Sequence, residues 1–146
     1  MKHIWIVDDQ PDIRELLKAI LSLHDYRVAT FASGMELLDR LGRDEHPDLV
    51  VLDVQMPEID GWDALSEIRL RYGDFGPHVV MCTVTGHPRD LLHGWTLGCD
   101  GYIWKPFDLK LLVAEVAAVI DRDNPARARV RRTAIGEVRL LLRSAV

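Results

Sequence analysis

Short apolar runs recur along the chain, and each is bounded by aspartate, glycine or proline. The runs are mostly apolar or β-branched, which is typical of strands buried within a sheet. No internal repeat accompanies them. The pattern predicts five strands, at residues 3–7, 27–31, 49–52, 79–82 and 101–103.

Between the predicted strands, apolar residues recur at the 3.6-residue period of an amphipathic helix. Pro11 suits the first turn of the first helix, and glycines 73 and 98 mark the ends of the third and fourth. The apolar positions are Ile13, Leu16, Leu17, Ile20 and Leu21; Met35, Leu37, Leu38 and Leu41; Ala64, Leu65, Ile68 and Tyr72; the segment 88–97; and Leu109, Leu112, Val113, Val116 and Ile120. Five strands alternating with five helices predict an α/β fold, an open parallel sheet covered on both faces.

Composition fits a single domain, because 146 residues, 48% of them hydrophobic, suffice for one ordinary core. No apolar run is long enough to cross a bilayer, and Asp8 and Asp9 follow the first strand too closely for a secretory signal. We therefore expect a cytoplasmic protein without a membrane partner. Cys82 and Cys99 lie in apolar surroundings and are expected to be buried free thiols.

Charge is unevenly distributed along the chain. Residues 121–146 hold seven arginines and three acidic residues, so they contribute +4 to a net charge of −5, and the first 120 residues carry −9. We expect a domain over residues 1–122 and an arginine-rich tail over 123–146, with a linker-like stretch at 126–132. The tail is either a helix that packs on the domain or a partner, or the start of an output domain. Any nucleic-acid contact is expected from the tail or from such a domain.

Polar residues stand where the apolar strands end. Asp8 and Asp9 follow the first strand, and Asp53, Thr83 and Lys105 follow the third, fourth and fifth. Each has an ordinary explanation as a cap, a strand end or a solvated charge. Parallel strands, however, bring their carboxyl ends to one edge of the sheet. Three carboxylates gathered there need a cation such as Mg²⁺, and a nearby lysine and hydroxyl suit a phosphoryl group held on a carboxylate.

Over about residues 2–121 the chain resembles the receiver domain of two-component response regulators. The resemblance is carried by Ile-Val-Asp-Asp at 6–9, Leu-Asp-Val-Gln-Met-Pro at 52–57 with Asp60-Gly61, Val-Met-Cys-Thr at 80–83, and Gly-Cys-Asp-Gly-Tyr-Ile-Trp-Lys-Pro-Phe at 98–107. It implies a flavodoxin-like (βα)5 fold, a doubly wound five-stranded parallel sheet of order 2-1-3-4-5.

The resemblance also implies roles for individual residues. Asp53 would accept phosphate from a histidine kinase, a phosphotransfer protein or a small phosphodonor. Asp8, Asp9, Asp53 and the carbonyl of Gln55 would hold Mg²⁺. Thr83 and Lys105 would contact the phosphoryl group. Such a protein catalyses its own phosphotransfer and dephosphorylation and is not a conventional enzyme.

Further positions match the switch and the loops around the site. Tyr102 would turn inward when Thr83 moves, and Pro106 would follow Lys105 through a cis bond. Pro57 and Gly61 would shape the loop after the third strand. The face formed by the fourth helix, fifth strand and fifth helix would then change its binding of a downstream output protein or domain.

Other interpretations stay open at this point. The chain could be the N-terminal receiver of a longer DNA-binding transcription regulator. A homodimer through the same face is conceivable, although Glu115 and Asp121 stand where winged-helix regulators carry arginines. A magnesium-dependent aspartyl phosphatase would need an acid where Gln55 stands. A flavin- or nucleotide-binding module would lack its phosphate loop, because Asp8 and Asp9 would repel phosphate.

Overall fold

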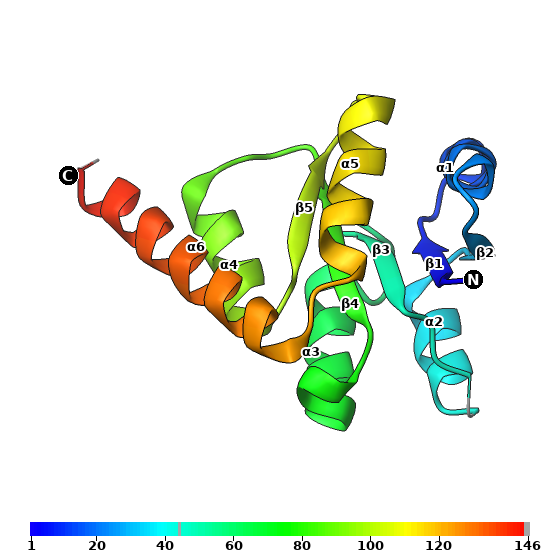
Figure 1. Ribbon diagram of the computed structural model, residues 1–146, viewed down its shortest axis with the longest axis horizontal. Coiled ribbons are helices and arrows are strands. Elements are labelled where there is room, and N and C mark those ends of the chain that lie inside the picture. The colour runs from blue at the N-terminus through cyan, green and yellow to red at the C-terminus, as the bar shows by residue number, and fades with distance from the viewer. Residues whose placement is uncertain (44, 145–146) are drawn as a thin grey trace.

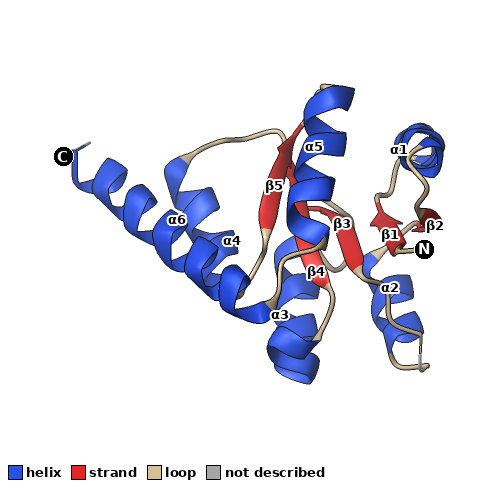
Figure 2. Cartoon of the chain, in the orientation of Figure 1, coloured by secondary structure: helices blue, strands red, loops and turns tan. Residues whose placement is uncertain are grey.

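Five parallel strands form the central sheet of the protein (Figures 1 and 2). The computed structural model describes residues 1–43 and 45–144. The strands lie in the order β2-β1-β3-β4-β5, which confirms the predicted flavodoxin-like topology. Their bounds are β1 (His3–Val7), β2 (Arg27–Phe31), β3 (Leu49–Asp53), β4 (His78–Thr83) and β5 (Gly101–Trp104). The strands β3, β4 and β5 each continue one residue further than predicted, so Asp53 and Thr83 are the last residues of their strands.

Five helices cover the two faces of this sheet, as the hydrophobic periodicity predicts. The helices α2, α3 and α4 pack on one face, where they bury side chains such as Leu37 and Leu65. The helices α1 and α5 pack on the other face with Leu17 and Val116. Their bounds are α1 (Pro11–Leu23), α2 (Gly34–Leu41), α3 (Gly61–Tyr72), α4 (Pro88–Leu97) and α5 (Leu109–Ile120), with a short 3₁₀ turn at Gly73–Phe75 after α3.

Alternation along the strands fills both halves of the core. In β1, Ile4 and Ile6 face α1 and α5, whereas Trp5 and Val7 face α2, α3 and α4, because successive side chains of a strand point to opposite faces. All four are almost completely buried. This rigid core leaves the carboxyl ends of the strands as the place where polar side chains can gather.

A sixth helix, α6 (Asn124–Ser144), follows the predicted domain and packs along α4 (Figure 1). Asn124 and Pro125 are the first residues of α6, after α5 has ended at Ile120. The side chain of Asp123 caps the new helix by accepting a hydrogen bond from the backbone N–H of Ala126 at 2.9 Å. Within the described part of the chain, no helix is both long and apolar enough to cross a bilayer.

The linker-like stretch at 126–132 is therefore helical, and two of its arginines anchor α6 to the domain. Arg127 is 2% exposed and pairs with Asp100, which is 1% exposed and directly precedes β5. Arg131 bonds the same carboxylate at 2.9 Å, and Arg69 of α3 bonds it at 3.0 Å. Burial raises the pKa of Asp100, but the hydrogen bond and charge of Arg127, with the charges of Arg131 and Arg69, outweigh burial and hold that pKa below its ordinary value. The arginines of a linker-like stretch are ordinarily solvated, and sequence periodicity gave no sign of this buried partner.

Candidate functional site

Three carboxylates meet at the carboxyl ends of β1 and β3. Ligand oxygens of Asp8, Asp9 and Asp53 all lie within 4.8 Å of one another. Asp8 and Asp53 are buried and Asp9 is exposed. They meet because β1 and β3 are parallel neighbours in the sheet, so residues that follow or end these strands share one edge. The structure thus brings together the acidic residues that the sequence singled out.

Lys105 reaches this carboxylate cluster from the end of β5. Its Nζ donates to Oδ2 of Asp8 at 2.9 Å and lies 3.3 Å from Oδ1 of Asp53. The next peptide bond, from Lys105 to Pro106, is cis. The lysine side chain is 16% exposed, so solvent screens these ion pairs only weakly.

The charges in this cluster are not balanced by Lys105 alone. Burial, together with the charge of Asp8, raises the pKa of Asp53 to about 6, although Lys105 acts in the opposite direction. Burial lowers the pKa of Lys105, but its hydrogen bond to Asp8 and the charge of Asp53 outweigh burial and leave that pKa above its ordinary value. Three acidic groups facing one ammonium offer an oxygen-only donor set with excess negative charge, which fits a hard divalent cation such as Mg²⁺.

Thr83 lies at the end of β4, beside the cluster. Asp53 pairs in register with Cys82, so Thr83 is one residue past the strand position opposite Asp53. Its hydroxyl accepts a hydrogen bond from the backbone N–H of Thr85 at 3.2 Å. A depression of about 520 Å³ lies over this edge, and its lining includes Asp9, Gln55 and Thr83. This depression gives a small molecule or a partner side chain access to the strand ends.

The loop after β3 is held close to Asp53. The N–H of Gln55 donates to Oδ1 of Asp53 at 3.3 Å, and the N–H of Gly61 donates to the carbonyl of Val54 at 2.8 Å. A Cβ at Gly61 would collide with the backbone carbonyl of Asp53, so α3 can start here only from glycine. Pro57 lines the depression. Gly61 therefore permits the close approach of α3 to β3, and the loop-shaping role of Pro57 stays a prediction.

Tyr102 lies in the middle of β5 with its ring buried, 8% exposed. Its hydroxyl donates to the backbone carbonyls of Asp90 and Leu91 in α4, at 3.0 and 3.1 Å. Its ring meets that of Trp95 in a T-shaped arrangement, with centroids 5.8 Å apart. Gly94 makes room for the ring, because a Cβ at this position would collide with the Tyr102 hydroxyl. Tyr102 therefore ties β5 to α4 in this conformation.

Several residues around the site were not predicted from the sequence. Trp62, Thr85 and Asp90 also line the depression above Asp53, although they come from α3, the β4–α4 loop and α4. Their positions depend on how the loops fold over the sheet edge. Hydrophobic periodicity could not have distinguished Trp62 from a core residue.

A model of the response regulator receiver domain matches residues 4–117 of the chain. The chain belongs to the response regulator receiver family. The "Probable transcriptional regulator ycf27" of Guillardia theta is 40% identical over 125 residues, which are 86% of this chain and 48% of that protein. "Response regulator SaeR" of Staphylococcus aureus (strain USA300) is 34% identical over 122 residues, 84% of this chain and 52% of that protein. This receiver domain thus spans about half the length of the curated relatives it matches.

Solved receiver structures share the fold. Chemotaxis protein CheY4 of Vibrio cholerae superposes with a TM-score of 0.76 at 28% identity, over 82% of this chain and 98% of that one. Response regulator TrrA of Thermotoga maritima, described in complex with Mg(2+)-BeF, superposes with a TM-score of 0.72 at 36% identity, over 82% and 99%. Family and fold, as predicted from the sequence, are confirmed.

Proposed function

We propose that this receiver domain is a signalling switch that takes a phosphoryl group onto a carboxylate oxygen of Asp53. The donor is a histidine kinase, a phosphotransfer protein or a small phosphodonor. A new P–O bond forms to Asp53 as the bond between phosphorus and the donor atom breaks. The observation that carries the proposal is the meeting of Asp53 with Asp8, Asp9 and Lys105 at one open edge of the sheet.

The donor set fits Mg²⁺, with Asp8, Asp9, Asp53 and the carbonyl of Gln55 as the groups that would hold it. When bound, the ion supplies positive charge beside the oxygens of the phosphoryl group. The related protein TrrA is described in complex with Mg(2+)-BeF, which contains the same metal ion. Excess negative charge among the carboxylates supports this assignment independently of the relative.

Two further side chains would stabilise the phosphorylated state. The ammonium of Lys105, held by Asp8 and 3.3 Å from Asp53, neutralises a phosphoryl oxygen. The hydroxyl of Thr83 donates a hydrogen bond to another oxygen once it leaves its present contact with the N–H of Thr85.

The output of the switch is the surface made by α4, β5 and α5. Movement of Thr83 opens space at the end of β4, and a shift of the Tyr102 ring toward it would break the two hydrogen bonds to α4. A groove of about 740 Å³ crosses this surface and is lined by Tyr102, Trp104 and Leu111, with Val130 of α6 at its wall. A downstream protein or output domain in the cytoplasm would bind here.

The surface is less suited to the symmetric homodimer of winged-helix regulators, because Glu115 lines the groove in place of the expected arginine. A longer transcription regulator remains compatible with the half-length match to ycf27 and SaeR. Gln55 cannot serve as the acid of an aspartyl phosphatase, which removes the support for that alternative.

Incubation with acetyl phosphate and Mg²⁺, followed by intact-mass spectrometry, tests the proposal. We expect the mass to increase by one phosphoryl group per chain. No increase is expected when EDTA is present during the incubation, or when Asp53 is replaced by asparagine (Asp53→Asn). Asp60→Asn is the matched control, since Asp60 caps α3 and lies outside the carboxylate cluster. Equal labelling of the wild type and Asp53→Asn would overturn the assignment of the acceptor.

A further inference from the structure

The outward face of α6 carries an arginine row, composed of Arg129, Arg132, Arg139 and Arg143. Separations of three, seven and four residues place all four side chains on one side of a helix that turns 100° per residue. All four are exposed. None forms an ion pair with another residue that the structure describes. The row therefore leaves four positive charges without intramolecular partners among those residues.

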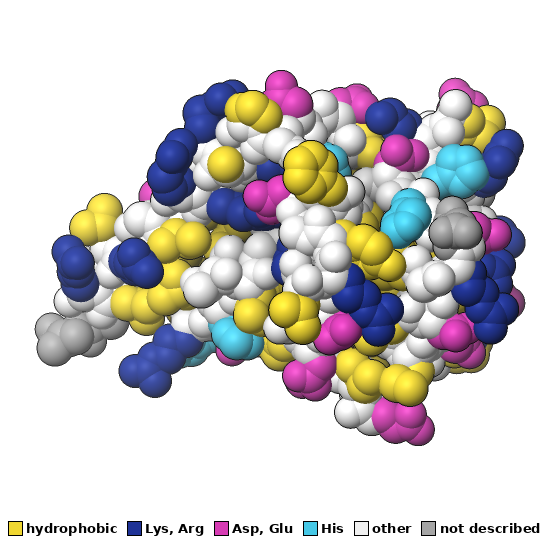
Figure 3. All heavy atoms as spheres, turned by 90° about the horizontal axis from the view of Figure 1, so that it is seen from below, with side chains coloured by type: hydrophobic (Ala, Val, Ile, Leu, Met, Phe, Trp, Pro, Cys, Tyr) yellow, Lys and Arg dark blue, Asp and Glu magenta, His cyan; other side chains and the backbone are white. Residues whose placement is uncertain are grey.

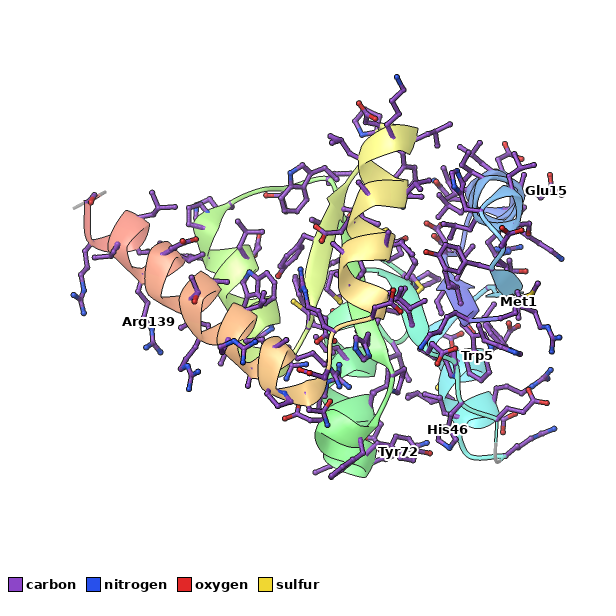
Figure 4. All side chains as sticks on the ribbon, in the orientation of Figure 1. Met1, Trp5, Glu15, His46, Tyr72 and Arg139 are labelled. Carbon is purple, nitrogen blue, oxygen red and sulfur yellow. The ribbon has the colours of Figure 1, made fainter. Side chains whose placement is uncertain are left out.

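The opposite face of α6 packs on the domain as far as Val138, and this contact orients the helix that carries the arginine row. Arg127 and Arg131 bond Asp100, and Val138 is 6% exposed. Arg139 points away from the body of the protein in Figure 4. Figure 3 shows Lys and Arg side chains at the projecting end of the molecule. A bound partner would not have to order this helix first, which lowers the entropic cost of binding.

The net charge of α6 is positive, whereas that of the rest of the chain is negative. Glu137 is the one acidic residue in the sequence of α6, against six arginines, whereas residues 1–120 carry a net charge of −9. An acidic domain that carries one cationic strip presents a directional field, which selects partners of opposite charge and orients them toward the strip.

We propose that the arginine row binds the phosphodiester backbone of double-stranded nucleic acid without reading its base sequence. The row extends about 21 Å along the helix axis, given a rise of about 1.5 Å per residue, so it can follow several consecutive phosphates. Arginine is suited to this task because its planar guanidinium forms paired hydrogen bonds with phosphate oxygens.

The composition of the row favours this partner over a membrane or an acidic protein. Thr133 and Gly136 lie between the arginines, so the face offers no aromatic anchor for a protein pocket and only Leu140 at its edge for insertion into lipid. Contacts to phosphates alone position a protein on a duplex but carry no sequence information. This site is separate from Asp53, so the inference stands or falls independently of phosphoryl transfer.

Fluorescence anisotropy of a labelled duplex of about 20 base pairs, titrated with the full chain at about 50 and 200 mM salt, tests the proposal. If four phosphates are contacted, the affinity should fall about a hundredfold between the two salt concentrations, because binding releases condensed counterions. Replacement of the whole row by glutamine, R129Q/R132Q/R139Q/R143Q, should abolish binding at 200 mM salt and at least halve the salt dependence. Circular dichroism should show an unchanged fold, since all four side chains are exposed.

A matched control removes four positive charges elsewhere, as K18Q/R27Q/R89Q/K110Q. These side chains are also exposed and stand on α1, β2, α4 and α5. Retention of binding by this control, with loss in the arginine-row variant, supports the site. An equal loss of duplex affinity in both variants would overturn it, because binding would then depend on the net charge of the protein and not on the arginine row. Absence of duplex binding at about 50 mM salt would also overturn the proposal. In that case, binding to vesicles that contain phosphatidylserine, or to a second copy of the chain, would identify the alternative partner.

Discussion

Arg127 and Asp100 form a two-point ion pair between α6 and the start of β5. Arg127 Nε donates to Oδ1 at 2.8 Å and Arg127 Nη2 donates to Oδ2 at 3.2 Å. The same carboxylate accepts a hydrogen bond from the N–H of Val79 at 2.8 Å. A buried carboxylate is costly unless charge and hydrogen bonds compensate it, so α6 contributes directly to the stability of the sheet edge next to Tyr102.

Replacement of Arg127 by alanine should lower the free energy of unfolding by about 2–3 kcal/mol. Arg131 and Arg69 would remain on Asp100, so the loss is smaller than that of a carboxylate left with no partner. Urea denaturation provides the measurement. Arg129→Ala, on the outward face of the same helix, should change stability by less than about 0.5 kcal/mol. Equal effects of the two substitutions would contradict the anchoring role of Arg127.

Replacement of Lys105 by methionine should tighten Mg²⁺ binding while it impairs phosphoryl acceptance. The ammonium occupies Oδ2 of Asp8 and repels a divalent ion at the same carboxylates. Loss of that charge should raise the Mg²⁺ affinity by about tenfold, equivalent to about 1.4 kcal/mol. Calorimetric titration measures the affinity, and Lys110→Met is the control because Lys110 is exposed at the start of α5. Unchanged or weaker Mg²⁺ binding in Lys105→Met would count against a shared site.

Replacement of Gly94 by alanine should disturb Tyr102 specifically. The added methyl group would overlap the Tyr102 hydroxyl and also approach Trp62. We expect a loss of about 1–3 kcal/mol of stability from this overpacking and a changed near-ultraviolet circular dichroism spectrum.

The double variant Gly94→Ala/Tyr102→Phe separates this contact from a general effect on α4. Because phenylalanine lacks the colliding hydroxyl, Gly94→Ala should cost clearly less in the Tyr102→Phe background than in the wild type. Additive effects would show that the hydroxyl is not the group displaced.

His78 should make stability fall as the pH drops below about 6.5. Burial lowers the pKa of His78 in the folded protein, with the charges of Arg127 and Arg69 acting in the same direction and Asp100 and the Arg122 carbonyl acting against them. Its Nε2 lies 2.7 Å from that carbonyl oxygen. The unfolded chain therefore takes up the proton first, and acidification favours unfolding.

The measurement compares wild type with His78→Gln by urea denaturation at about pH 7.5 and 5.5. We expect the wild type to lose more stability than the variant between these values, because protonation of His78 favours the unfolded chain. Parallel losses in the two proteins would assign the pH dependence to other groups.

Residues near the strand ends were predictable because a regular backbone places them. The alternation of apolar strands and amphipathic helices gives the parallel sheet, and a parallel sheet brings Asp8, Asp53, Thr83 and Lys105 to one edge. No side-chain detail was needed for this inference. The receiver motifs then supplied the roles of Gln55 and Tyr102, which spacing alone does not provide.

The environment of Asp100 could not be predicted in the same way. Its carboxylate is compensated by side chains 31 residues before it and 27 and 31 residues after it, from helices whose packing is not encoded in any local pattern. A run of arginines normally indicates a solvated segment, because burial of a guanidinium requires a partner. Only the three-dimensional contact between α6 and α4 reveals that partner.

The ion pairs of Arg127 and Arg131 with Asp100 show that α6 contributes to the stability of the receiver domain. The receiver family match stops at residue 117, before Arg127 and Arg131. A chain that ends at residue 122, after α5, would leave the Asp100 carboxylate with Arg69 as its remaining arginine partner. The shortened chain should melt at a lower temperature than the intact one. For this protein, contacts that stabilise the edge of the sheet extend past the residues that the family model matches.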